Sequence, residues 1–209
     1  MKTKTSLKTL QMVQTAILAA ILIVMTFTPL GYFNLGPVMI TLLMIPVVIG
    51  AIVIGPAAGA FLGLVFGISS FIKAFSDPLF GSILLNINWI YTLILCLVPR
   101  VLMGLFVGLI FRALSKIDRT KIVSFIISSL SGALLNTALF VGALLLLFGN
   151  SDFLKQFGPT PIAIVGALVT VNALIEAIVC TVVGTAIAKA LRRYLIDPKE
   201  PKAPAAPAE

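Results

Sequence analysis

The chain has 209 residues, of which 60% are hydrophobic and only 11% are charged, and its mean hydropathy is +1.17. An ordinary soluble domain carries about a quarter charged residues, so this composition excludes a protein that folds in water and predicts one that folds in lipid. Runs such as TAILAAILIVMTF are continuously apolar rather than alternating with period two, which excludes a transmembrane barrel and predicts an all-α helix bundle.

Six apolar segments bounded by turn residues predict a polytopic bundle of six transmembrane helices. They lie at roughly 9–28, 38–54, 57–72, 83–114, 121–148 and 160–191. The second and third are short for a span and are joined only by the turn at Gly55 and Pro56. The fourth would be about 48 Å long at about 1.5 Å per residue, well beyond a hydrocarbon core of about 30 Å. It is therefore either one helix kinked at Pro99 or two elements.

The basic residues are distributed asymmetrically around these segments. Lys and Arg favour the short cytoplasmic loops of membrane proteins. With six spans and a cytoplasmic N-terminus, the basic residues near both chain ends and within 112–121 face the cytoplasm, and only Lys73 and Lys155 lie outside. Two full spans in the fourth segment would spoil this asymmetry. We therefore expect a multi-pass protein of the cell membrane with both termini inside, whose net charge of +8 attracts anionic lipid and implies no nucleic-acid partner.

Three outer loops follow from this topology, at 28–37, 73–82 and 149–161, and each mixes aromatic residues with Gly, Pro, Asn or Asp. This composition suits loops that fold over a bound molecule, although aromatic residues also anchor helices at the membrane interface. The last segment, 195–209, is rich in Pro and Ala and is expected to be disordered. The chain is thus predicted to be one membrane domain over residues 1–194 with a cytoplasmic tail.

The sequence lacks the residues that catalysis or cofactor binding would need. The stretch GPAAGAFLG has the glycines of an ATP-binding P-loop but not its lysine. There is no histidine, and Cys96 and Cys180 stand alone in apolar runs, which indicates small buried hydrophobic residues rather than metal ligands. The apolar segments hold one acid, so they offer no nucleophile with a base. We expect a protein that is not an enzyme and has no cofactor or metal.

That acid is Glu176, and it shares its depth in the membrane with other polar residues. Charged side chains inside a membrane are costly, so each is a functional candidate whose partner must be found. Counted at about 1.5 Å per residue from the basic inner ends, Glu176 and Arg100 each lie roughly 20 Å up their helices, and Asn136 lies roughly 22 Å up. Asn172, one turn before Glu176 on the same face, lies somewhat higher. These residues predict a polar layer that could line a cavity open to the outside.

The fourth segment leads toward that layer. Five of its residues follow spacings of three and four and form one stripe that ends at the arginine: Asn86, Trp89, Leu93, Cys96 and Arg100. Pro99 lacks an N–H, so it frees the Leu95 carbonyl and bends the helix beside Arg100, which predicts a polar nook. Alternatively, Arg100 and Glu176 form a buried ion pair that pins two helices, with the asparagines bonding between helices, and the two roles can coexist.

Small residues recur at a helical spacing in two of the segments. Gly59, Gly63 and Gly67 in GAFLGLVFG repeat every four residues, which lets helix backbones approach closely in lipid. We therefore expect the third helix to pack tightly within the molecule. Ala16 and Ala20 in AILAA give the first helix the same spacing, which is common in apolar helices and means little alone.

The order of these features resembles the substrate-binding S component of energy-coupling factor (ECF) vitamin transporters along nearly the whole chain apart from the tail. The resemblance rests on AILAA, IPVVIGAIVIGPAAGAFLGLVFGISSFI, LVPRVLMGLFVGLIFRAL and VNALIEAIV. It implies the six-helix S-component bundle of a bacterial membrane, which binds one vitamin from outside between the outer parts of helices four to six and the loops. It also implies a membrane scaffold protein and two cytoplasmic ATPases as partners, with Ala16 and Ala20 at the scaffold interface.

The stretches GLVFGISSFI, DPLFGS and LVPRVLMGLFVGLIFRAL are most similar to the pantothenate-specific branch of that family. Pantothenate carries a carboxylate that Arg100 could hold in a bidentate pair, and hydroxyls and an amide that Asn86, Asn136 and Asn172 could match. Folate, niacin and biotin also carry carboxylates. Neutral riboflavin would depend instead on Trp89 and the aromatic residues of the loops.

Glu176 is the least expected of these vitamin contacts, because it would repel an anion unless it pairs with Arg100 or accepts hydrogen bonds from hydroxyls. A rival hypothesis from another class is a self-sufficient secondary transporter or channel, in which Arg100 and Glu176 respond to a coupling proton. A membrane enzyme or assembly factor is disfavoured by the shortage of nucleophile and base pairs.

Overall fold

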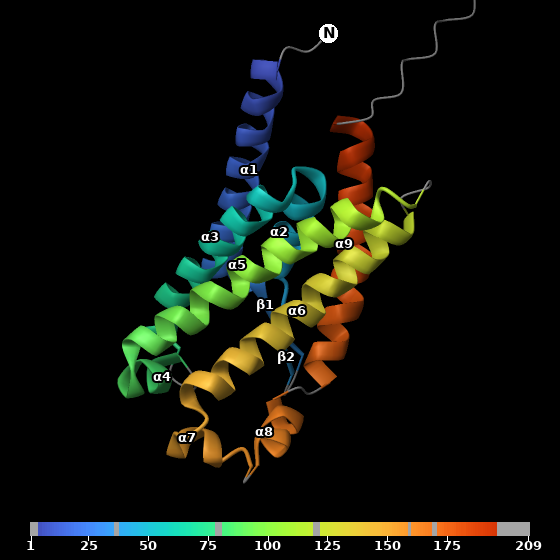
Figure 1. The fold of residues 1–209 in the computed structure, drawn as a ribbon. Helices are drawn as coiled ribbons and strands as arrows, with labels where there is room; N and C mark the ends of the chain where they lie inside the picture. Colours follow the sequence, from blue (N-terminus) through green and yellow to red (C-terminus); the bar gives the residue numbers. More distant parts are fainter. Residues whose placement is uncertain are drawn as a thin grey trace, which may run out of the picture.

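The computed structural model describes residues 4–35, 38–77, 81–118, 122–158, 160–168 and 171–195, so nearly all of the predicted tail lies outside it. Over the described residues the chain is helical apart from one short hairpin, in agreement with the expected helix bundle (Figure 1). The helices are α1 (Lys4–Phe27), α2 (Met44–Val53), α3 (Pro56–Ala74), α4 (Gly81–Ile87), α5 (Trp89–Leu114), α6 (Ile122–Phe148), α7 (Asp152–Lys155), α8 (Pro161–Leu168) and α9 (Val171–Leu195). A short 3-10 helix (Pro29–Gly31) precedes the antiparallel strands β1 (Tyr32–Leu35) and β2 (Val38–Thr41).

Five of the described helices are long and apolar enough to cross a membrane, over Lys8–Phe27, Pro56–Ala74, Trp89–Leu114, Ile122–Phe148 and Ala173–Leu191. The second predicted span, 38–54, is instead divided between strand β2 and the ten-residue helix α2. Hydrophobic periodicity alone does not distinguish a short buried strand from a buried helix. All the residues of α2 are buried, so its apolar character serves the core of the bundle. The count of six spanning helices stays a prediction.

The fourth predicted segment forms two elements, α4 and α5, and it breaks at Asn88 rather than at Pro99. Asn88 has an extended backbone (φ −162°, ψ 108°), and its side-chain oxygen accepts hydrogen bonds from the amides of Ile90 and Tyr91. It is thus the N-cap of α5, which continues through Pro99. Because α4 has only seven residues, the break adds no second span and leaves the predicted charge asymmetry intact. The last predicted segment likewise divides, into α8 and α9.

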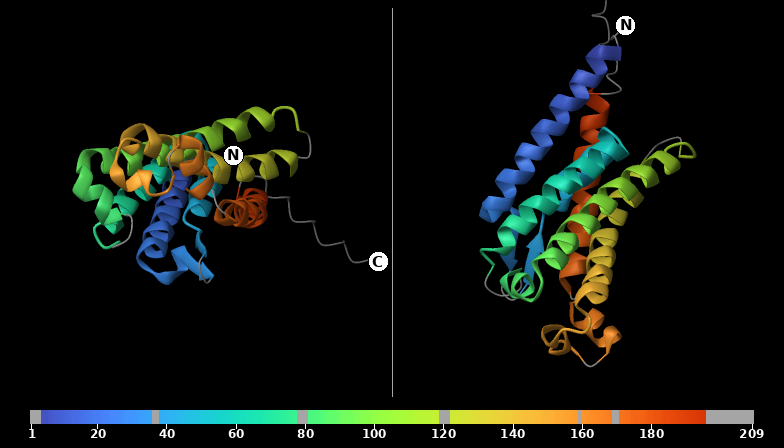
Figure 2. Two further views of the ribbon diagram at one scale, coloured as in Figure 1. Left: turned by 90° about the horizontal axis from the view of Figure 1, so that it is seen from below. Right: turned by 60° about the vertical axis from the view of Figure 1, so that its left-hand side comes forward.

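Helix α2 lies at the centre of the bundle, where it contacts α1, α3, α5, α6 and α9. The long helices follow one another beside it, with α3 against α5, α5 against α6 and α6 against α9 (Figure 1 and Figure 2). The fully buried side chains of Leu62, Met103 and Val107 join those of α2 in the core. Figure 1 shows the start of α1 and the end of α9 at one end of the bundle, and α4, α7 and α8 at the other.

The packing of α3 on α5 depends on a glycine seam, in which three glycines of α3 face three carbonyl groups of α5. Gly59 faces that of Gly104, Gly63 that of Arg100, and Gly67 that of Cys96. A Cβ atom at Gly67 would lie 2.7 Å from the Cys96 oxygen, and Cβ atoms at the other two glycines would come closer still to their carbonyls. The predicted close approach of α3 is therefore confirmed, and its partner is the backbone of α5.

Candidate functional site

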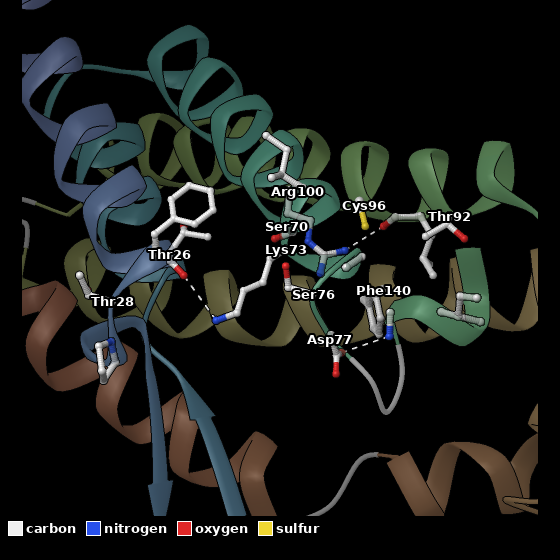
Figure 3. Close-up of a pocket in the computed structure, with 17 residues that line it drawn as sticks. Thr26, Thr28, Ser70, Lys73, Ser76, Asp77, Thr92, Cys96, Arg100 and Phe140 are labelled. Atoms are coloured by element: carbon white, nitrogen blue, oxygen red, sulfur yellow. Dashed lines mark hydrogen bonds between the residues drawn. The ribbon is translucent and has the colours of Figure 1, made fainter. Parts of the chain in front are cut away.

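A cavity of about 700 Å³ lies between α1, α3, α4, α5 and α6, at the end of the bundle that holds α4 (Figure 3). Its wall is charged and polar in part. The charged lining residues are Lys73, Asp77 and Arg100, and the hydroxyl-bearing ones are Thr26, Thr28, Ser70, Ser76 and Thr92. Apolar side chains such as those of Leu95 and Phe140 complete the wall. With two cations and one carboxylate, the described lining has a net formal charge of +1, which favours an anionic ligand.

Arg100 is held in one orientation from several sides. Its Nη1 donates a hydrogen bond of 2.8 Å to the Leu95 carbonyl oxygen. The central carbon of its guanidinium lies 4.7 Å from the ring centre of Phe140 and 5.5 Å from that of Phe66, within the range of cation–π interactions. A guanidinium that is fixed before a ligand arrives loses little entropy on binding a carboxylate, so this group is preorganised for that task.

Two features of the sequence place Arg100 here. Pro99 has no N–H to donate to the Leu95 carbonyl, and that carbonyl accepts from Arg100 instead, so the nook predicted beside the proline is formed by the arginine itself. The backbone of the same residue packs against Gly63 in the glycine seam. The proline therefore directs the side chain, and the seam fixes the backbone that carries it.

Lys73 and Asp77 follow each other by one turn at the end of α3 and face different walls of the cavity (Figure 3). The amine of Lys73 donates to the Thr26 carbonyl oxygen at 3.4 Å, which joins the end of α3 to the end of α1. One carboxylate oxygen of Asp77 accepts from the Gly81 amide at 3.1 Å and holds the start of α4. The contact of Lys73 is long for a hydrogen bond, and its stem is flexible, so it is more adaptable than Arg100.

The structure brings only part of the predicted stripe to this cavity. Cys96 and Arg100 line it, whereas Asn86 and Trp89 do not. Asn86 belongs to α4 and is exposed, and Trp89 is 60% exposed at the first residue of α5. The break at Asn88 interrupts the helical period, so a spacing counted across it no longer places residues on one face.

The predicted polar layer is also divided. Glu176 takes a partner other than Arg100: its Oε1 accepts a hydrogen bond of 2.7 Å from the Thr41 amide, which ties the end of β2 to α9. Asn136 is half-buried, and its side-chain oxygen is buried without a hydrogen-bond partner. Asn172 lies in the first turn of α9, but its side chain lies outside the described residues. Arg100 thus lines the cavity, whereas Glu176 holds the hairpin against α9.

The alanines expected at a partner interface, Ala16 and Ala20, are both exposed on α1. Only 11% of the apolar stretch of this helix is buried in the bundle. Helix α1 therefore keeps most of its surface for lipid or for another protein.

Sequence reasoning missed several lining residues, chiefly Asp77, Lys73, Thr92 and Phe140. The pattern marks Lys73 only as an outer charge and the loop 73–82 only as a possible cover. One signal was present, because Lys73 and Asp77 carry opposite charges one turn apart at the end of an apolar helix. No comparable signal distinguishes Thr92 or Phe140 from ordinary helix residues.

Known proteins resemble this chain over most of its length. The profile of the family described as ECF transporter, substrate-specific component, matches residues 10–188. The pantothenic acid transporter PanT of Lactococcus lactis subsp. cremoris (strain MG1363) is 30% identical over 192 residues, which are 85% of this chain and 91% of the relative. The pantothenate transporter PanT of Leuconostoc mesenteroides subsp. mesenteroides is 32% identical over 111 residues, which are 50% of this chain and 52% of the relative. The resemblance that the motif stretches predict is confirmed.

Proposed function

This chain belongs to the family of ECF transporter substrate-specific components, and from that membership we propose that it binds pantothenate in the cavity around Arg100 as the vitamin-binding subunit of an ATP-driven importer. The names of both relatives support this choice of substrate. A role in transport also agrees with the five helices that are long and apolar enough to span a membrane.

The observation that carries the proposal is the fixed guanidinium of Arg100 in a cavity with a net positive lining. Pantothenate is a monoanion whose carboxylate fits a bidentate pair with arginine. Its amide and its two hydroxyls can bond to the hydroxyls of Ser70, Ser76 and Thr92, which line the same cavity. A volume of about 700 Å³ lies within the range of small-molecule sites, about 300–1,000 Å³.

The proposal includes a direction of binding. The start of α1 and the end of α9, which carry basic residues, lie at the end of the bundle opposite to α4 (Figure 1). By the positive-inside tendency, that end with both termini faces the cytoplasm, and the cavity beside α4 opens outward. Helix α2 then serves as the sixth helix of the bundle without spanning the membrane fully.

The proposal also includes a partner. Membership of the family implies a membrane scaffold and two ATPases as partners, which would supply the ATP hydrolysis that a chain with no P-loop cannot carry out in the usual way. The exposed face of α1 with Ala16 and Ala20 suits a helix of that scaffold, because small residues allow close approach.

Calorimetric titration of the purified chain with pantothenate, riboflavin, folate, niacin and biotin tests the substrate. We expect pantothenate alone to bind tightly, because the others do not combine a terminal carboxylate with a flexible diol. Tight binding of neutral riboflavin, with pantothenate silent, would reject the assignment.

Mass spectrometry of a gently solubilised complex tests the partner. A vitamin-binding subunit of an ECF importer should copurify with two ATPases and a scaffold protein. A chain that transports pantothenate in vesicles without them, driven by an ion gradient, would instead be a secondary transporter.

A further inference from the structure

The cavity carries more charge than one carboxylate requires. Arg100 alone would suffice to hold a monoanion, yet Lys73 in the last turn of α3 and Asp77 just after it add a second cation and an anion. These two side chains interact electrostatically with each other. Together they add no net charge, but they add hydrogen-bond donors and a strong acceptor.

Asp77 has a fixed position in the wall. Its Oδ2 accepts from the Gly81 amide at 3.1 Å, so the carboxylate is tied to the start of α4. Arg100 projects from α5 beside Phe140, whereas Asp77 follows α3 and is bonded to the start of α4, so the two groups come from different elements around the cavity (Figure 3). A ligand whose carboxylate lies on Arg100 can therefore extend its other end toward Asp77. An anchored carboxylate accepts hydrogen bonds from hydroxyl groups and repels acids.

We infer that Asp77 is a specificity-determining residue, which accepts a hydrogen bond from the hydroxyl end of the ligand and excludes ligands that carry a second acidic group at that end. This inference rests on the proposed function, because it assumes a ligand with a carboxylate at one end and hydroxyls at the other. The amine of Lys73 is turned toward the Thr26 carbonyl oxygen, so a phosphate at this end would face the Asp77 carboxylate, whereas a neutral diol could donate to it.

The test compares pantothenate with its 4′-phosphate ester, which replaces the terminal hydroxyl by a dianion. Calorimetry on the purified full chain in detergent should show the ester bound at least about 100-fold more weakly, since juxtaposed like charges cost several kcal/mol. In Asp77→Asn the ratio of the ester's Kd to that of pantothenate should fall by about tenfold or more. Pantothenate itself should lose no more than about tenfold, because the amide oxygen still accepts a hydrogen bond.

The matched control is Asp152→Asn, which removes an acid from the exposed pair with Lys155 outside the cavity and should leave the ratio unchanged. Asp77→Ser is a second variant whose hydroxyl can also accept from the Gly81 amide, so the start of α4 is kept. The inference would be overturned if both Asp77 variants kept the Kd ratio of the unaltered chain, even if both ligands bound more tightly. Pantothenate binding would still stand in that case. Failure of the unaltered chain to bind pantothenate would instead reject the proposed function.

Discussion

The glycine seam between α3 and α5 and the half of the α6–α9 pair that lies toward α7 and α8 are both contacts between apolar helices, but they are packed in opposite ways. In the seam, the glycines of α3 leave no room for even a methyl group above the carbonyls of α5. Between α6 and α9 lies a groove of about 800 Å³, with an almost wholly apolar lining that includes Leu134, Val141 and Leu174. A Cβ atom at Gly142, which lines this groove, would meet nothing within 4 Å.

The difference shows why one wall of the cavity is rigid. In lipid, helices gain no hydrophobic driving force from association, so close van der Waals packing and hydrogen bonds hold them together. The seam provides that packing from Cys96 to Gly104 of α5, a little over two turns, and Arg100 lies within them. The groove leaves α6 and α9 without comparable contact in their halves toward α7 and α8, where Glu176 ties α9 to the hairpin instead. The fixed charge of the site belongs to the tightly packed wall.

The largest effect should follow from removing that charge. Arg100→Ala is expected to weaken pantothenate binding by about 2–5 kcal/mol, the range for removing one partner of a buried charge pair. Calorimetry measures the loss, and Lys155→Ala is the control, since Lys155 is an exposed cation outside the cavity. An arginine that only pinned helices would leave the affinity unchanged in the variant while lowering its thermal stability.

The next effect should come from filling the seam. Gly63→Ala places a methyl group against the Arg100 carbonyl, which is backbone and cannot move aside as a flexible side chain can. We expect a loss of about 3 kcal/mol in unfolding free energy, the upper end of the range for overpacking, together with weaker pantothenate binding. Thermal unfolding followed by the fluorescence of Trp89, the chain's one tryptophan, reports the first effect and calorimetry the second. Unchanged stability would mean that α3 and α5 are not in close contact.

A smaller effect is expected on the other side of the molecule. Glu176→Ala leaves the Thr41 amide without its acceptor and should cost about 1–3 kcal/mol of stability. Since Glu176 and Arg100 contact different groups, the losses of unfolding free energy caused by removing each side chain should add to within about 0.5 kcal/mol in a double-mutant cycle. A coupling energy several times larger would instead support the alternative in which Arg100 and Glu176 form a buried ion pair. Glu176→Gln, which keeps an acceptor oxygen, is the control and should lose less.

The sequence predicts the cavity wall formed by α3 and α5 better than it predicts the rest of the fold and site. Arg100 is conspicuous because a charge in an apolar run is rare, and the repeat of Gly59, Gly63 and Gly67 indicates close packing by its spacing alone. Both signals are local, and both are explained by contacts within or between regular helices. The helices themselves follow from hydropathy, which requires only that backbone groups be satisfied in lipid.

The features that the sequence does not predict depend on breaks in regular structure or on distant contacts. Asn88 caps a helix only because the chain leaves helical geometry there, and an apolar run around it gives no sign of the break. Glu176 and Thr41 are 135 residues apart, so no spacing rule connects them. Lys73 and Asp77 carry opposite charges one turn apart, but that spacing does not indicate that the fold places both on the cavity wall.

The smallest expected effect compares the seam and the groove most directly, because the same glycine-to-alanine substitution should lower stability in the seam and raise it in the groove. Gly142→Ala adds its methyl group to open space on α6 and replaces a residue that weakens a helix interior. We expect unfolding free energy to rise by about 0.5–1 kcal/mol with pantothenate affinity unchanged. Thermal unfolding measured beside Gly63→Ala under one set of conditions gives the contrast. A loss of stability at Gly142 would show that the groove is closed in the membrane and that α6 and α9 pack there as tightly as α3 and α5.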